Sequence, residues 1–375
     1  MPIHIELHRD PTIFSELADE WSTLLQNSVV DTIFLTPQWQ NVWWKHFQAG
    51  RDLRVLLARD DDGAPSTLEE VPQTGAASDG QFAGKGRNTN GELVGIAPFY
   101  AMEKDGQTIL QFVGGVEISD YLDFVVAKGR EEEVYRALML YLRDEAPPWD
   151  LLDLHCLPGH SPTRAGLLCQ ACAECCSEDL EAQQEEAAPY IPLPDDWEVY
   201  LGSLDKKQRH EIRRKMRRAQ AQAEMRWYRV QEAAQLEENI DLFLNLHRAS
   251  HPEKDDFMTP QMEGFFREMA HLTWKQGWLN LYLLWLDGRP AATMWCFDYN
   301  NDLLVYNSGY EPSWRYNLSS GIVLLSHCIQ EAIERGKRHF DFLRGDEDYK
   351  YRFGAVEGAV YRLVLRKQIP KSADA

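Results

Sequence analysis

The two halves of the chain repeat one coarse order of extended and helical segments, and this repetition constrains the fold more than any other feature. Short apolar runs alternate with longer helical patterns, which is typical of mixed α/β proteins. We expect strands at residues 3–7, 53–58, 92–102, 108–113, 121–126, 151–157, 226–230, 279–285, 291–299, 303–309, 339–343 and 359–366. We expect helices at residues 11–26, 38–47, 131–144, 195–223, 232–249, 259–276 and 320–335.

Chain length and two changes in composition predict two domains. The chain has 375 residues, and a single hydrophobic core usually stops growing at roughly 250–300 residues. Residues 177–188 are acidic and rich in glutamine, and they precede the proline-containing residues 189–194. We therefore predict domains at residues 1–188 and 189–375. Residues 60–91 have almost no large apolar side chains, which predicts a disordered insertion in a hairpin.

The charge and the first residues indicate where the protein works. A formal net charge of −20 argues against broad binding to nucleic acid or to anionic membranes, which favour clustered Lys and Arg. The sequence has no apolar run of about 18 residues, and its first seven residues are neither basic nor strongly apolar. We expect no membrane insertion and a cytoplasmic location. The odd number of cysteines, seven, fits reduced thiols.

Four cysteines form the only run with metal-like spacing. Cys169, Cys172, Cys175 and Cys176 resemble part of an iron–sulfur or zinc motif. The run has neither a separately placed fourth ligand nor a Cys-Pro ending, and a helix beginning near Pro162 would use these thiols as small apolar side chains. The histidines have no metal-binding spacing. We favour the structural interpretation and expect no metal.

A strand, loop, helix and strand over residues 303–343 form the most informative unit. Its loop ends in the small residues Ser319, Ser320 and Gly321 where a helix begins, which leaves backbone N–H groups that suit a pyrophosphate. The two serines are equally suited to act as N-caps.

Dense charge follows the next strand, at residues 340–354, where the sequence reads FDFLRGDEDYKYRFG. Ligands collect at the carboxyl ends of strands in open α/β sheets. The alternative is a solvated loop in which Lys350 pairs with Asp346 or Asp348 at the surface. In the first half, Asp120 and Tyr121 are candidates to face a cleft between the halves, or to form a turn with its caps.

This stretch, together with residues 119–123 and the basic residues 206–215, resembles the GNAT-related BioF2-like acyltransferases, which include proteins associated with cellulose and exopolysaccharide synthesis. The Fem aminoacyltransferases are more distantly similar, through an aromatic-Lys-x-x-Phe-Gly motif matched by residues 349–354. The resemblance implies an α/β (α+β) fold with two tandem GNAT-like domains. Each domain is expected to hold a mixed, mainly antiparallel sheet flanked by helices, with catalysis in the second.

The resemblance also implies roles for individual residues. Acyl-CoA is the expected donor, and the loop that binds it in GNAT enzymes corresponds here to Arg315, Asn317, Ser319, Ser320 and Gly321. Leu318 and Ser320 stand where the family has glycines. The expected catalytic residues are Lys350, which orients an anionic substrate, Tyr349, which protonates the thiolate, and Asp341 and Asp346 as candidate bases. The expected substrate-binding residues are Arg344, Glu347, Asp120, Tyr121, Arg209 and Arg213, with Glu347 also a candidate base.

The resulting hypothesis is transfer of an acyl group from acyl-CoA to an amine, or to a hydroxyl, of a sugar or amino-acid acceptor. Envelope polysaccharide metabolism is the implied setting, and polysaccharide-synthesis proteins are candidate partners. Two alternatives stay open. The basic residues 206–218 suit the phosphates of a tRNA, as expected for an aminoacyl-tRNA-dependent Fem-like enzyme. The missing loop glycines suit a non-catalytic accessory protein.

Overall fold

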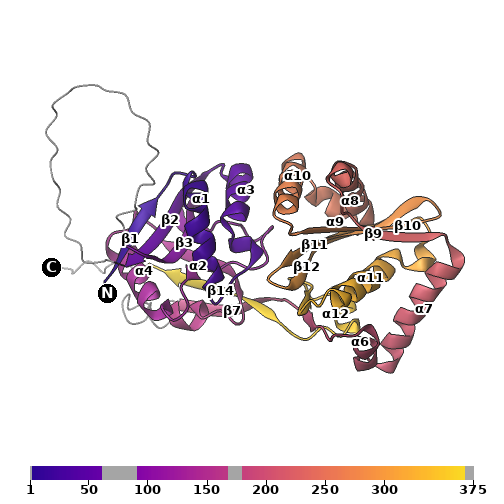
Figure 1. The fold of residues 1–375 in the computed structure, drawn as a ribbon. Coiled ribbons are helices and arrows are strands. Elements are labelled where there is room, and N and C mark those ends of the chain that lie inside the picture. The colour runs from indigo at the N-terminus through magenta and orange to yellow at the C-terminus, as the bar shows by residue number, and fades with distance from the viewer. Residues whose placement is uncertain (1, 61–90, 168–179, 368–375) are drawn as a thin grey trace, which may run out of the picture.

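The computed structural model describes residues 2–60, 91–167 and 180–367. The chain forms two lobes, each built on one sheet, that lie side by side (Figure 1). The first sheet has the strand order β1-β2-β3-β4-β6-β14-β7, with β5 paired to β3. The second has the order β8-β13-β12-β11-β10-β9. Residues 61–90 of the predicted disordered insertion and the Cys169–Cys176 run lie outside the described residues.

The elements of the first lobe follow the predicted order closely. Its strands are β1 (Ile3–His8), β2 (Arg51–Asp60), β3 (Leu93–Lys104), β4 (Gln107–Phe112), β5 (Val125–Val126), β6 (Leu151–Pro158) and β7 (Leu180–Ala187). Its helices are α1 (Ile13–Glu16), α2 (Ala18–Gln26), η1 (Ile33–Leu35), α3 (Pro37–Phe47) and α4 (Glu131–Asp144). The predicted hairpin around the insertion is confirmed, because β2 and β3 pair antiparallel.

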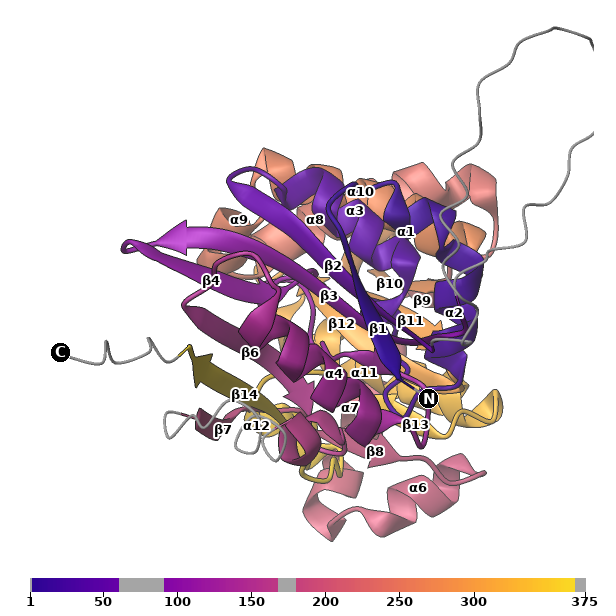
Figure 2. The ribbon, with the colours of Figure 1, turned by 90° about the vertical axis from the view of Figure 1, so that its left-hand side faces the viewer.

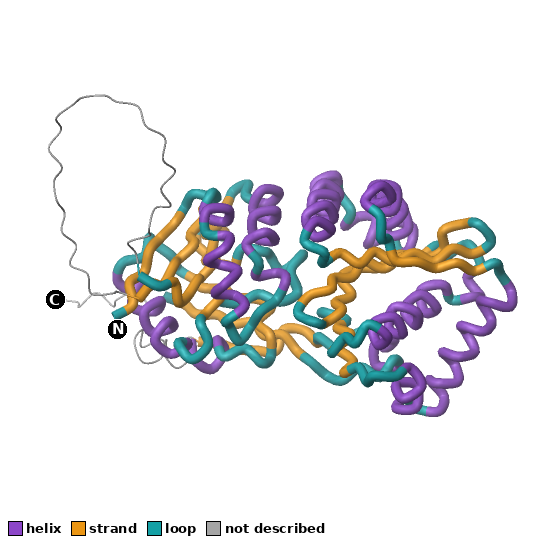
Figure 3. Tube along the Cα trace, in the orientation of Figure 1, coloured by secondary structure: helices purple, strands orange, loops and turns teal. Residues whose placement is uncertain are grey.

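The second lobe has helices on both faces of its sheet, with α8 and α10 on one side and α11 and α7 on the other (Figure 3). Its strands are β8 (Tyr190–Pro192), β9 (Met225–Arg229), β10 (Leu279–Leu286), β11 (Arg289–Tyr299), β12 (Asp302–Tyr310) and β13 (His339–Asp341). Its helices are α6 (Trp197–Ser203), α7 (Lys206–Gln222), η2 (Ala233–Gln235), α8 (Leu236–Ser250), α9 (Pro252–Phe257), α10 (Pro260–Lys275), η3 (Tyr316–Leu318), α11 (Ser320–Glu334) and α12 (Asp348–Arg352).

The repetition seen in the sequence is a repetition of topology. In the first lobe β2, β3 and β4 pair antiparallel, α4 crosses over, and β6 returns parallel to β4. In the second lobe β10, β11 and β12 pair antiparallel, α11 crosses over, and β13 returns parallel to β12. Each sheet is therefore mixed and mainly antiparallel, as expected.

The last strand, β14 (Ala359–Arg366), was expected beside the strands of the second half, and this expectation is wrong. It lies in the first sheet between β6 and β7 (Figure 2). Residues 180–187, which belong to the acidic stretch at the end of the predicted first domain, form the edge strand β7 beside it. The apolar side chains Val360, Leu363 and Leu365 are buried there, so the first lobe completes its core with the end of the chain.

Local signals placed several boundaries correctly. The Thr36 hydroxyl accepts a hydrogen bond from the Trp39 N–H and caps α3, which has Pro37 at its first position. Asp287 and Gly288 both have positive φ, as a two-residue type I′ hairpin turn requires. The helix expected at residues 195–223 is instead two helices, α6 and α7, because the extended Leu204 and Asp205 interrupt it.

Aromatic side chains join the two lobes. The Trp39 ring, on α3, lies 5.9 Å from Phe265, 5.7 Å from Phe297 and 5.6 Å from Tyr306, all of the second lobe. The Trp39 indole is only 1% exposed and donates to the Ser119 hydroxyl at 2.9 Å. Large edge-to-face aromatic contacts of this kind stabilise an interface beyond the area they bury. The lobes therefore share one hydrophobic core across their boundary.

Candidate active site between the lobes

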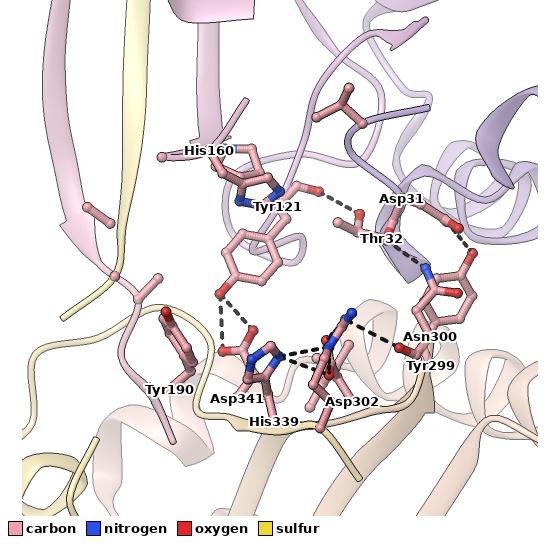
Figure 4. Close-up of a pocket in the computed structure, with 18 of the residues that line it drawn as sticks. Asp31, Thr32, Tyr121, His160, Tyr190, Tyr299, Asn300, Asp302, His339 and Asp341 are labelled. Carbon is pink, nitrogen blue, oxygen red and sulfur yellow. Dashed lines mark hydrogen bonds and ion pairs between the residues drawn. The ribbon is translucent and has the colours of Figure 1, made fainter. Parts of the chain in front are cut away.

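A cavity of about 1280 Å³ lies where the two lobes and the segments that connect them meet (Figure 4). The connecting segments run side by side, since Ala188 N–H donates to Gly358 O and Tyr190 pairs with Val356. The polar and aromatic side chains of the lining are Asp31, Thr32, Tyr121, His160, Gln184, Tyr190, Tyr299, Asn300, Asp302, Arg338, His339, Asp341, Glu357 and Tyr361. A large concave space with a few convergent polar groups is the usual form of a ligand site.

Asp341, the last residue of β13, has the most strongly shifted pKa among the acidic side chains that line the cavity. The Tyr121 hydroxyl, from the first lobe, donates to its two carboxylate oxygens at 3.1 and 3.0 Å. The Leu343 N–H donates to Asp341 Oδ1 at 2.7 Å. Burial outweighs these hydrogen bonds and raises the pKa of Asp341 to about 7. A carboxyl group with this pKa can take up a proton near neutral pH.

Other polar side chains of the cavity lining form hydrogen bonds with one another. Asp302 accepts hydrogen bonds from Arg338 Nη2 at 2.8 Å and pairs with His339 Nδ1 at 3.1 Å. The Tyr299 hydroxyl donates to Asp31 Oδ1 at 2.7 Å, and burial raises the pKa of Asp31. These pairs bring together residues far apart in the sequence.

Two residues predicted to bind substrate form an ion pair behind the cavity wall. Arg344 Nε donates to Asp120 Oδ1 at 2.8 Å, and Arg344 also donates to the Val116 carbonyl. Burial raises the pKa of Asp120 despite this partner. The structure thus brings residues 120–121 and 341–344 into one cluster that crosses the lobe boundary. Of the two residues predicted to face a cleft, Tyr121 lines the cavity and Asp120 does not.

Lys350 lies in the same cluster but is buried, with 2% of its surface exposed. Its ammonium donates to the carbonyls of Arg344 at 2.8 Å and Gly345 at 3.0 Å, and it pairs with Glu347 at 2.9 Å. Three contacts use the three N–H donors of a lysine. The alternative of a surface pair with Asp346 or Asp348 is wrong, because the partner is Glu347 and the lysine is inside.

The other residues of the charged loop have separate surroundings. Asp346 is exposed and accepts a hydrogen bond from the Tyr351 hydroxyl at 2.8 Å. Tyr349 packs its ring 6.0 Å from Phe342, and burial raises its pKa. Neither Asp346 nor Tyr349 lines the cavity between the lobes.

The loop predicted to bind the donor, residues 315–321, follows the C-terminal end of β12. Asp341 instead pairs near the N-terminal end of that strand. Arg315 pairs with Asp287 at 2.5 Å, the exposed Asn317 is in η3, and Leu318 is buried against Leu286 and Ala291. The Ser320 hydroxyl donates to the Ala291 carbonyl at 3.1 Å. The two positions without glycine are therefore filled by side chains that pack against the β10–β11 hairpin.

The start of α11 remains open in spite of this packing. Ser319 has a φ of 54° and precedes the helix without a side-chain cap bond. A Cβ added to Gly321 would meet no atom within 4 Å. The first turn of α11 has no acidic residue, whereas α4, its counterpart in the first lobe, begins with Glu131, Glu132 and Glu133.

Arg209 and Arg213 lie on α7, away from the cavity lining. Arg209 donates to the Gly202 carbonyl at 3.2 Å, and Arg213 pairs with Glu198. The structure does not bring them to the cluster at Asp341.

Sequence reasoning missed the acidic and aromatic side chains of the cavity, such as Asp31, Asp302 and Tyr190, because they stand singly in unremarkable turns and strand ends. It also missed Lys254, which donates to the Ser308 carbonyl of β12 at 2.5 Å and whose pKa is lowered by burial. Beside it, burial lowers the pKa of His247 to about 4. No spacing in the sequence marks these residues, since contact across the fold brings them together.

Two general properties hold over residues 2–60, 91–167 and 180–367. No cluster of three or more His, Cys, Asp or Glu side chains is arranged to hold a metal ion there. In the same ranges, every helix is too short or too polar to cross a membrane. Cys156, Cys296 and Cys328 are buried and unpaired thiols.

Comparison with known proteins agrees with this architecture. Residues 206–351 match the protein family described as the acetyltransferase (GNAT) domain. No match is found among curated protein sequences. The fold is similar to the crystal structure of FemX, with a TM-score of 0.61 and 12% identity over 97% of both chains. It is also similar to a conserved protein of unknown function from Bacteroides thetaiotaomicron VPI-5482, with a TM-score of 0.56 and 11% identity over 97% of this chain and 100% of that one. The predicted mixed α/β fold, with two mixed sheets that are flanked by helices, is confirmed, and the family match lies in the second lobe.

Proposed function

We propose that the protein is an N-acyltransferase that binds an amine acceptor in the cavity between the lobes and uses Asp341 as the base. The single observation that carries this proposal is the Asp341 carboxyl group, which lines the cavity and has its pKa raised to about 7. A general base works best when its pKa is near the operating pH. The GNAT family match over residues 206–351, which includes Asp341, supports the same class of reaction.

The donor binds in the second lobe, with acyl-CoA as the expected donor. The pairing of β12 with β13 ends at Leu304 and Asp341, while β12 continues to Tyr310, so the two strands part beside the proposed base. The open first turn of α11 offers backbone N–H groups to phosphate, whereas three glutamates at the start of α4 would repel it. This difference supports a single donor site at the start of α11, without a second one at the start of α4.

In the reaction, the amine nitrogen attacks the carbonyl carbon of the thioester, and Asp341 takes the proton that the nitrogen loses. The C–S bond then breaks, and the thiolate takes a proton, for which Tyr349 is the proposed source. Arg344 and Lys350 hold the loop that follows Asp341, since one contacts Asp120 and the other contacts two loop carbonyls. We assign both to positioning.

The test is an acyl-transfer assay with acyl-CoA donors and a panel of primary amines, comparing Asp341→Asn with Asp346→Asn. Both changes remove one carboxylate from the same loop region, but only Asp341 lines the cavity. We expect Asp341→Asn to lower kcat/KM by about 100-fold or more, as loss of general-base catalysis does. Asp346→Asn should stay near wild type. Equal loss in both variants, or none in Asp341→Asn, contradicts the assignment.

An aminoacyl group carried by tRNA is the second candidate donor. Residues 206–218, all on α7, hold eight Lys and Arg residues and one acid, and Lys206 and Lys207 are exposed. Such a surface suits nucleic-acid phosphates. Turnover with aminoacyl-tRNA and none with acyl-CoA would favour this donor. Absence of turnover with either donor would favour an accessory role in polysaccharide synthesis, the setting suggested by the BioF2-like resemblance.

A further inference from the structure

We infer that the cavity between the lobes selects an acceptor that carries a cationic amine and has no phosphate or carboxylate group. This inference rests on the proposed function for its link to catalysis, but the charges of the cavity carry it. Four carboxyl groups line the space: Asp31, Asp302, Asp341 and Glu357. The side chains of the lining that can be cationic are Arg338, His339 and His160.

The cationic groups are not free to meet an anion. Arg338 donates to Asp302 through Nε at 3.2 Å and Nη2 at 2.8 Å, and His339 pairs with the same carboxylate. Burial lowers the pKa of His160, which keeps its imidazole neutral at pH 7. Within the described lining, therefore, Asp302 already balances the guanidinium and imidazole beside it.

The remaining carboxyl groups of the lining have no cationic partner among the described residues. Asp31 contacts the Tyr299 hydroxyl, and Asp341 contacts the Tyr121 hydroxyl and the Leu343 N–H. No ion pair involves Asp31, Asp341 or Glu357 among the residues that the structure describes. Asp31 belongs to the first lobe and Asp341 to the second, so carboxyl groups without a cationic partner face the cavity from both sides (Figure 4).

Aromatic rings add a second attraction for a cation. The lining includes Tyr121, Tyr190, Tyr299 and Tyr361. The faces of such rings attract ammonium groups, and a desolvated site strengthens this attraction. A protonated amine would thus be drawn in. It gives one proton to water before the neutral nitrogen attacks, and Asp341 takes the second proton. A phosphate or carboxylate on the acceptor would instead meet carboxyl groups that have no cationic partner.

Two sets of probes that differ in one charged group test this inference without any acyl donor. The first compares glucosamine with glucosamine 6-phosphate and N-acetylglucosamine, and the second compares cadaverine with 6-aminohexanoate. Binding is measured by calorimetry at pH 7. We expect the cationic member of each set to bind at least about tenfold more tightly than its partners. Equal or tighter binding of an anionic or acetylated member, or no binding of either amine, overturns the inference.

Asp31→Asn and Asp256→Asn provide the matched variants. Asp31→Asn keeps an oxygen for the Tyr299 hydroxyl and removes the charge, whereas Asp256 is exposed on α9 and outside the lining. We expect Asp31→Asn to weaken amine binding by about tenfold and Asp256→Asn to leave it unchanged. Unchanged binding by Asp31→Asn contradicts the inference. A protein that binds amines but transfers no acyl group would contradict only the proposed function.

Discussion

The hydroxyl of Tyr121, in the first lobe, donates to the carboxylate of Asp341, in the second lobe, at 3.0 Å. The two residues are 220 positions apart in the sequence. The contact makes the environment of the proposed base depend on the way the two lobes are assembled. A hydrogen bond to a carboxylate favours its charged form, so Tyr121 opposes the effect of burial on Asp341.

Tyr121→Phe should therefore raise the pKa of Asp341 above its value of about 7. The base would then become ionised only at higher pH, and the acidic limb of the kcat/KM profile should move to higher pH. Charged or titratable neighbours that act on Asp341 include Asp120 and Asp302, and neither is changed in this variant. A pH–rate profile with an unmoved acidic limb would contradict the role of this hydrogen bond.

Asp123 should make folding stability depend on pH. Its side chain is buried, it accepts hydrogen bonds from Thr163 and the Phe124 N–H, and burial raises its pKa from 3.8 to about 6. The native state then binds more protons than the unfolded state between about pH 4 and 6. This group's contribution to stability is present below that window and is lost as the pH rises through it.

Asp123→Asn should remove that component of the pH dependence. Urea unfolding at several pH values gives the free energy of unfolding of the variant and the wild type. We expect the slopes of this free energy against pH to differ between about pH 4 and 6 and to agree outside that range. A wild-type slope that persists in Asp123→Asn would assign the effect to other acids, of which Asp341 is the first to examine.

Lys350→Ala should destabilise the protein as well as lower its activity. The change leaves the Arg344 and Gly345 carbonyls without their donor in a buried site, which costs about 1–3 kcal/mol for an unsatisfied group. Arg352→Ala, which removes an exposed pair with Asp348, is the control and should cost less than about 1 kcal/mol. Unchanged stability of Lys350→Ala with lost turnover would instead support direct contact with substrate.

Ser319→Gly should stabilise the protein by about 0.5–1 kcal/mol. Ser319 has a φ of 54°, a left-handed conformation that costs a residue with a Cβ roughly 1–2 kcal/mol, and its side chain makes no cap bond. The larger conformational entropy of glycine in the unfolded chain offsets part of the gain. Thermal unfolding measures the change. Ser320→Gly, which loses a hydrogen bond to Ala291, should have the opposite sign.

The sequence by itself determined the elements whose signals are local. A Thr-Pro pair starts α3, an Asp-Gly pair forms the turn between β10 and β11, and the alternation of strands and helices repeats in both halves. In each case the residues that decide the conformation are neighbours in the chain, and their hydrogen bonds or φ values are set within a few residues. The motif at residues 340–354 also indicated the region that holds Asp341.

Tertiary structure alone decided which strands share a sheet and which charges meet. The sequence of β14 fits either sheet, and only packing against β6 and β7 places it in the first lobe. The pKa of Asp341 and the burial of Lys350 depend on Tyr121, on Glu347 and on carbonyls that the folded chain brings near. Desolvation and long-range contacts set these properties, and neither is encoded by the spacing of residues along the chain.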